Sequence, residues 1–143
     1  MRFLCIYKPA KAEGAPPTPE MMETMGKFIE QSFKEGFLLS TEGCLPSALG
    51  ARVRSTGGSY TVTDGPFTES KELIAGFQIL QVNSLAEAIE WVKRGPNCSP
   101  TGEGEVEIRQ VYEMEDFAPV LSEEQIQHKV AKRAQLPNQT ANK

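Results

Sequence analysis

The stretch TDGPFTESKELIAGF, residues 63–77, separates two strand-like runs and decides the fold of the middle of the chain. Its Asp64-Gly65-Pro66 sequence favours a sharp turn, because Asp bonds nearby backbone N–H groups, Gly accepts unusual dihedral angles and Pro fixes its own. Residues 59–63 before the turn and residues 73–82 after it have the composition of strands. The same turn could hold the Asp64 carboxylate at the rim of a cleft, so it has a structural and a functional interpretation.

Four further segments have the composition of strands. Residues 2–8 are apolar at nearly every position and predict a strand in the centre of a sheet. Residues 37–41 predict a second strand, and residues 105–112 alternate as a last one. Residues 51–55 precede a Thr56-Gly57-Gly58 turn, so together with residues 59–63 they predict a hairpin.

Two segments carry the signals of helices packed on a sheet. Thr18 is the predicted cap of the first helix, with Pro19 at its first position and Gly36 after its end. Ser84 and Glu87 predict a capping box for the second helix, which Gly95-Pro96 ends. We expect their apolar stripes to face the core; these are Met21, Met22, Met25, Phe28, Ile29 and Phe33 in the first helix, and Leu85, Ala88, Ile89 and Val92 in the second.

Without the hairpin, the order of elements is β-α-β-β-α-β. This order predicts an α+β, ferredoxin-like split βαβ fold, with two helices on one face of an antiparallel four-stranded sheet. Strands 2–8 and 73–82 are apolar on both faces, which indicates that the second face is also covered. Because most homo-oligomers are two-fold symmetric, the predicted cover is a second copy of the chain.

Composition limits the class of protein. The 143 residues have an apolar share of 39% and a charged share of 24%, which predicts one soluble domain over residues 1–117. No apolar run reaches the roughly 20 residues that cross a bilayer, and the N-terminus is too short and interrupted for a signal peptide. Three cysteines without a CxxC pair predict reduced thiols and a cytoplasmic location.

The tail, residues 118–143, differs from the body in charge. It has four basic and two acidic residues, so its formal charge is +2. Because the whole chain has a net charge of −4, the body carries −6. An acidic body argues against nucleic acid as a partner. In the tail, Ser122 predicts the cap of a short helix, and the residues from Leu136 onward have the composition of disordered chain.

Several segments in the same order resemble the DGPF proteins, a branch of the YCII-related family. They are residues 63–77, Gly43, Pro46, residues 50–53, residues 88–91 and residues 102–111. The resemblance covers residues 2–117 and implies a ferredoxin-like, dimeric α/β barrel with a cleft near the dimer or sheet face. Some relatives resemble proteins encoded beside sigma factors or fused to them.

The histidines of that family are absent from the body of this chain. The resemblance implies a site that pairs a His with an Asp, whereas the single His here is His128 in the tail. Leu45 and Ser99 stand where DGPF relatives often carry His, and neither transfers protons near neutral pH. A base in this chain would therefore be Asp64, with Glu42 or Glu69 as a second carboxylate.

The predicted site surrounds the Asp64 turn. Arginines suit an anionic ligand because their guanidinium forks match carboxylates, although strand arginines also form surface ion pairs. A nucleophilic role for Cys98 would need a nearby base. The predicted catalytic residue is Asp64, and the predicted ligand-binding residues are Arg52, Asp64, Gly65, Pro66, Phe67, Glu69, Lys71 and Arg109.

Two functions follow from the sequence. The first is a dimeric small-molecule-binding protein for a polar or anionic metabolite, with acid–base chemistry at Asp64. The second is a non-catalytic regulatory or scaffold dimer that binds a protein such as a sigma or transcription factor. The sequence has no zinc-type His/Cys spacing and no nucleotide-binding glycine motif, so we expect no metal and no cofactor.

Overall fold

The structure, a computed structural model, describes residues 1–9, 13, 16–69, 73–96 and 103–136. The strands are β1 (Arg2–Pro9), β2 (Leu38–Gly43), β3 (Ala51–Thr56), β4 (Ser59–Asp64), β5 (Gly76–Gln81) and β6 (Gly104–Gln110), and the helices are α1 (Pro19–Lys34), α2 (Leu85–Arg94) and α3 (Glu123–Ala134). This order confirms the predicted α+β fold with its inserted hairpin. The boundaries shift at β5, which begins at Gly76 and not at Leu73, and at β6, which ends at Gln110.

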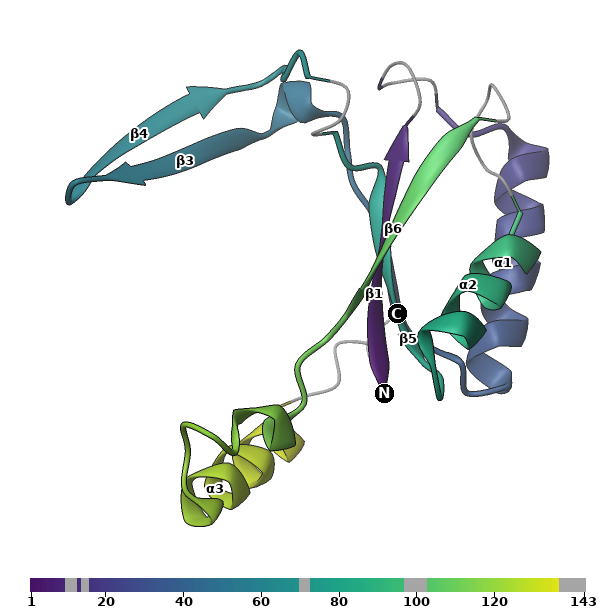
Figure 1. Cartoon of the computed structure of the whole chain (residues 1–143). Coiled ribbons are helices and arrows are strands. Elements are labelled where there is room, and N and C mark those ends of the chain that lie inside the picture. The colour runs from purple at the N-terminus through teal and green to yellow at the C-terminus, as the bar shows by residue number, and fades with distance from the viewer. Residues whose placement is uncertain (10–12, 14–15, 70–72, 97–102, 137–143) are drawn as a thin grey trace.

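The main sheet has the ferredoxin-like strand order β2-β5-β1-β6, with every pair antiparallel. β1 lies in its centre, as its continuous apolar sequence predicted. Helices α1 and α2 lie on the same face of the sheet (Figure 1). In the single chain the sheet is open, so a closed barrel is not formed within one copy.

The core lies between this face and the two helices. Phe3, Cys5 and Leu80 from the sheet are almost fully buried together with Trp91 from α2. The Trp91 ring packs on Phe28 of α1, with 4.9 Å between the ring centroids. Burial raises the pKa of the Cys5 thiol to about 11, so this thiol stays protonated and packs as a small apolar group.

The buried stripe of α2 differs from the prediction. Ala88 and Trp91 are buried, whereas Leu85 and Ile89 are 50% and 38% exposed. Trp91 has the largest apolar surface on this helix, so turning its ring toward the sheet rotates the predicted stripe outward. In α1, likewise, Phe28 and Ile29 pack on the core while the predicted stripe residues Met22 and Phe33 are exposed.

The predicted helix ends are present. The Thr18 hydroxyl accepts a hydrogen bond from the Met21 N–H, and Gly36 has a positive φ of 78° after the end of α1. At α2 the Ser84 hydroxyl accepts from the Glu87 N–H. The Glu87 carboxylate accepts from the N–H of Asn83 at 2.7 Å, one residue before Ser84, so the second bond of the predicted capping box is displaced by one residue.

The second face of the sheet carries apolar residues that no described helix covers. Leu4, Ile6, Phe77 and Ile79 alternate with the core residues of β1 and β5, and all four are half-buried. β6 borders them with charge, since Lys8 bonds Glu107 at 2.7 Å. This hydrogen bond raises the pKa of Lys8 and lowers that of Glu107. We call these four residues and their charged border the open face.

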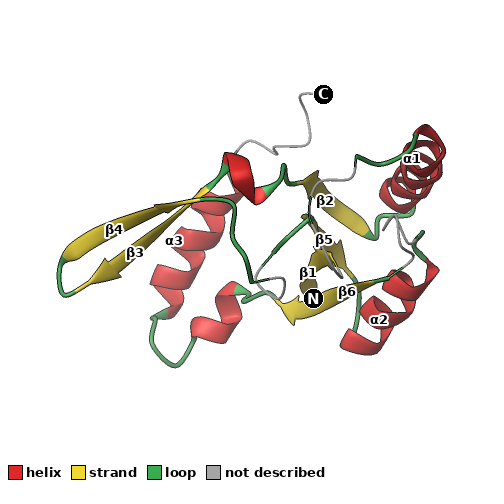
Figure 2. Cartoon of the chain, turned by 90° about the horizontal axis from the view of Figure 1, so that it is seen from above, coloured by secondary structure: helices red, strands yellow, loops and turns green. Residues whose placement is uncertain are grey.

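Two projections extend beyond the sheet on the side opposite α1 and α2 (Figure 2). One is the β3–β4 hairpin, and the other is α3 with the short 3₁₀ helix Met114–Phe117 before it. Arg2 of β1 holds the start of the second projection through two bonds to the Glu113 carboxylate, of 2.8 and 3.0 Å. The predicted helix after Ser122 is confirmed, and residues 137–143 lie outside the described residues.

Candidate ligand-binding site

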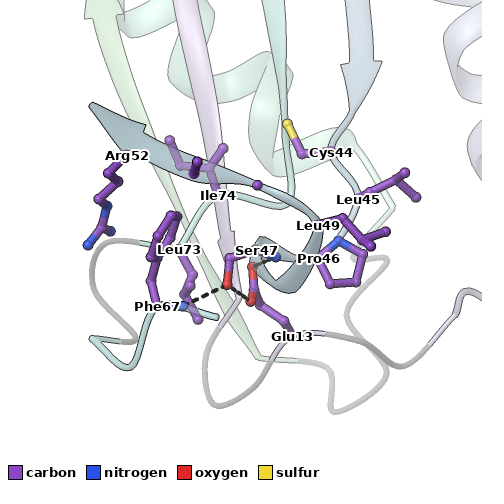
Figure 3. Close-up of a pocket in the computed structure, with 12 residues that line it drawn as sticks. Glu13, Cys44, Leu45, Pro46, Ser47, Leu49, Arg52, Phe67, Leu73 and Ile74 are labelled. Atoms are coloured by element: carbon purple, nitrogen blue, oxygen red, sulfur yellow. Dashed lines mark hydrogen bonds between the residues drawn. The ribbon is translucent and has the colours of Figure 1, made fainter. Parts of the chain in front are cut away.

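A cavity of about 570 Å³ lies where the hairpin leaves the sheet. Five parts of the described chain line it: the stretch from Cys44 to Leu49 with its 3₁₀ helix, the start of β3 with the preceding Gly50, Phe67, Leu73 with Ile74, and Glu13. Its walls are mainly apolar, and their polar groups come from Glu13, Ser47 and Arg52 (Figure 3). The lining residues are Glu13, Cys44, Leu45, Pro46, Ser47, Leu49, Gly50, Ala51, Arg52, Phe67, Leu73 and Ile74.

The Asp64-Gly65-Pro66 turn is fixed by close contact between backbones. The Gly65 N–H donates to the Gly50 carbonyl oxygen at 3.0 Å. A Cβ atom at Gly65 would lie 1.7 Å from the Ser47 carbonyl oxygen, a distance that no side chain tolerates. Gly65 is therefore required by the close approach of the turn to Ser47, a residue of the 3₁₀ helix that lines the cavity.

Ser47 joins three segments that are distant in sequence. Its backbone N–H donates to the Glu13 carboxylate at 3.0 Å, and its hydroxyl donates to the same carboxylate. The hydroxyl oxygen accepts from the Phe67 N–H at 3.0 Å (Figure 3). Bonds to an ionised carboxylate are stronger than neutral ones, so this group holds the floor of the cavity in place.

Arg52 and Phe67 form a contact within the lining of the cavity. The guanidinium carbon of Arg52 lies 3.8 Å from the centre of the Phe67 ring, within cation–π distance. This contact places a cation beside apolar walls.

The structure brings together some of the predicted site residues and separates others. Arg52 and Phe67 line the cavity, and Gly65 packs against its 3₁₀ helix. Asp64 is exposed at the end of β4, where it pairs with the lining residue Ala51. Pro66 and Glu69 are exposed nearby, and Lys71 lies outside the described residues. Asp64, Pro66 and Glu69 are not among the described residues that line the cavity.

Arg109 belongs to a different surface. It lies opposite Leu4 in the β1–β6 ladder, on the open face, and donates to Glu107 at 3.2 Å. Glu42 pairs with Phe77 between β2 and β5, so it also belongs to the sheet. Leu45 is an apolar lining residue that is 75% exposed.

Sequence reasoning missed Glu13 and Ser47. The two residues are 34 positions apart in loops without a repeating pattern, so no spacing rule connects them. The available signal was the Pro46-Ser47 pair, because Pro and Ser are both frequent turn residues and Ser side chains bond nearby backbone groups.

We also searched the described residues for a metal site, a histidine near the cavity and a membrane-spanning helix. Within them, no group of three or more His, Cys, Asp or Glu side chains is placed to hold a metal ion. His128 is exposed on α3, far along the chain from the cavity. None of the described helices has the length and apolarity needed to span a bilayer.

Comparison with known proteins identifies the family. The model of the YCII-related domain matches residues 1–115, and the chain belongs to this family. It is also similar to an uncharacterized protein, R00369, of Rhizobium meliloti (strain 1021), with 36% identity over 65 residues. The match covers 46% of this chain and 52% of that relative, so the chain spans about half of its length.

Proposed function

We propose that this member of the YCII-related family is a dimeric small-molecule-binding protein whose cavity takes an organic anion with an apolar body. The observation that carries the proposal is the Arg52 guanidinium resting on Phe67 at the edge of a mainly apolar cavity. Guanidinium groups bind carboxylates and phosphates through paired hydrogen bonds, and apolar walls take the remainder of such a ligand. The volume of the cavity suits a small metabolite.

Acid–base chemistry in this proposal belongs to Asp64. Its ladder partner Ala51 lines the cavity, which supports a position of Asp64 near the cavity. Glu13 is a second carboxylate, fixed inside the cavity by Ser47. Two carboxylates in different surroundings are a common basis for one acid and one base in a site without histidine.

The second copy is proposed from the open face. Leu4, Ile6, Phe77 and Ile79 form a contiguous apolar group on β1 and β5 with charged residues at its border. Apolar surface with a polar rim is typical of a protein interface, and a two-fold axis would place the same group from another copy against it.

A thermal-shift screen with separate panels of organic acids, amines and sugars tests the ligand class. An organic acid at 100 times its Kd should stabilise the protein by about 2.7 kcal/mol, a shift of several degrees. We expect Arg52→Ala to lose this shift. Arg54→Ala is the matched control, because Arg54 lies on the same face of β3 but does not line the cavity.

The outcomes separate the functions. An equal response in Arg52→Ala and Arg54→Ala would contradict anion binding in this cavity. With a bound acid identified, Asp64→Asn should retain the thermal shift and lose any conversion measured by mass spectrometry.

A scaffold dimer for a protein partner such as a sigma factor is the second candidate, favoured by the projecting helix α3 and its exposed Val130. A dimer that responds to none of the three panels would favour it.

A further inference from the structure

Glu13 brings a negative charge into a cavity whose walls are mainly apolar. Its side chain is half-buried, and its carboxylate accepts hydrogen bonds from the N–H and the hydroxyl of Ser47, which are both neutral donors. Among the described residues, no Lys or Arg lies within ion-pair distance of this carboxylate. The charge of Glu13 is therefore held in place by Ser47 without being neutralised.

A carboxylate in such surroundings complements a cationic group. Taking an ionised carboxylate out of water is costly unless a cation or further donors compensate it. Ser47 donates one hydrogen bond to each of the two Glu13 oxygens, whereas a carboxylate has about four acceptor sites. The remaining lone pairs can accept from a ligand, and an ammonium group supplies both the donors and the missing positive charge.

The positive charge of the cavity lies apart from this carboxylate. Arg52 rests on the Phe67 ring, the Phe67 N–H donates to the Ser47 hydroxyl, and Ser47 bonds Glu13. Figure 3 shows the four side chains in this order across the cavity. Two residues thus stand between the guanidinium and the carboxylate along the series of contacts, so the two charges occupy different parts of the cavity wall.

We propose that the ligand is a linear amino acid whose carboxylate and ammonium groups are separated by an apolar chain, with the carboxylate at Arg52 and the ammonium at Glu13. A simple organic acid would bring a second negative charge into a cavity that already contains one, and a free α-amino acid carries both charges at one end. This inference rests on the proposed function, narrows its ligand class and adds a recognition role for Glu13 beside the acid–base one.

Calorimetric titration of the unmodified protein with four probes of similar size tests the ligand class. The probe ε-aminocaproate has its two charges at opposite ends of a chain. Heptanoate replaces the ammonium by a methyl group, hexylamine replaces the carboxylate by a methyl group, and norleucine has the atoms of ε-aminocaproate with the amino group beside the carboxylate. We expect ε-aminocaproate to bind at least about tenfold more tightly than the other three, because it alone reaches both Arg52 and Glu13.

Glu13→Gln assigns the ammonium to its partner. The substitution removes the charge and keeps an oxygen that accepts from Ser47, so heptanoate should still bind. The preference for ε-aminocaproate over heptanoate should fall to within about threefold. Glu90→Gln is the matched control, because it removes the same charge from an exposed residue of α2 outside the cavity lining, and it should keep the full preference. Heptanoate binding separates the loss of a charge from a loss of the fold.

The outcomes distinguish this inference from the proposed function. Equal Kd values for ε-aminocaproate and heptanoate, or a preference that survives in Glu13→Gln, would overturn the inference and leave the anion site standing if Arg52→Ala abolishes heptanoate binding. Tightest binding of norleucine would overturn the separation of the charges. An unmodified protein that does not bind ε-aminocaproate would overturn the inference as well, and the proposed function would then depend on the organic-acid panel alone.

Discussion

The two faces of the four-stranded sheet are made by alternate residues of the same strands, yet they have different surroundings. Leu80 points toward α1 and α2 and has no exposed surface, whereas its neighbour Ile79 points to the open face and is half-buried. Both residues are aliphatic and of equal size. The strand residues make both faces of the sheet apolar. Which face is covered within one chain depends on the side where the helices pack.

The largest expected effect on stability comes from truncating Leu80 on the covered face of the sheet. Leu80→Ala should lower the free energy of unfolding by about 2–5 kcal/mol, because it leaves a cavity in the packed core. Ile79→Ala should cost about 1 kcal/mol in dilute protein, where the open face is wet. Urea unfolding at low and high protein concentration measures both, and equal losses at low concentration would mean that the two faces are equally covered within one chain.

An intermediate effect on stability is expected at the base of the hairpin. The strands of the hairpin are exposed, whereas its base is tightly packed. Gly65→Ala should cost about 1–3 kcal/mol, because its Cβ would collide with the Ser47 carbonyl oxygen. Gly43→Ala is the matched control, since a Cβ there meets nothing within 4 Å and Gly43 has an ordinary φ. Thermal unfolding of the two variants checks this, and a Gly65→Ala protein as stable as Gly43→Ala would contradict the close approach.

The smallest effect concerns the ion pair between Arg2 of β1 and Glu113, which holds the start of the α3 projection. Hydrogen bonds from Arg2 hold the pKa of Glu113 below its ordinary value of 4.5. The stability from this pair is therefore complete above about pH 4.5 and is lost as the pH falls through the lowered pKa of the folded state. Glu113→Gln should flatten that part of the pH dependence of unfolding between pH 5 and pH 3, roughly the range where such a carboxyl titrates. An unchanged profile would show that the pair adds no stability.

Much of the fold could be predicted because its signals are local. Thr18, Pro19 and Gly36 bound α1 through backbone rules that act within a few residues, and Gly57-Gly58 sets the hairpin turn in the same way. The side of α2 that is buried could not be predicted, because Trp91 packs on Phe28, 63 positions earlier in the chain. The helical periodicity of the α2 sequence does not indicate that Trp91 will contact Phe28.

The candidate site was predictable only in part for the same reason. The contact between Arg52 and Phe67 follows from the hairpin and its turn, which are continuous in sequence. The Glu13–Ser47 bonds join two irregular loops, and their pairing depends on how the whole domain folds. Whether Asp64 acts on a ligand stays a prediction, since Asp64 is exposed and is not among the residues that line the cavity.

The chain leaves the domain and re-enters it at neighbouring positions, at the two ends of the β3–β4 hairpin. Ala51 pairs with Asp64, and the Gly65 N–H bonds the Gly50 carbonyl oxygen, so entry and exit are joined before the hairpin extends. The remainder of the domain is therefore insensitive to the length of the hairpin, because lengthening at Gly57-Gly58 adds little closure entropy and lies away from the core. In terms of protein evolution and engineering, residues 52–63 are a replaceable module, whose reach can change while the sheet and cavity keep their geometry.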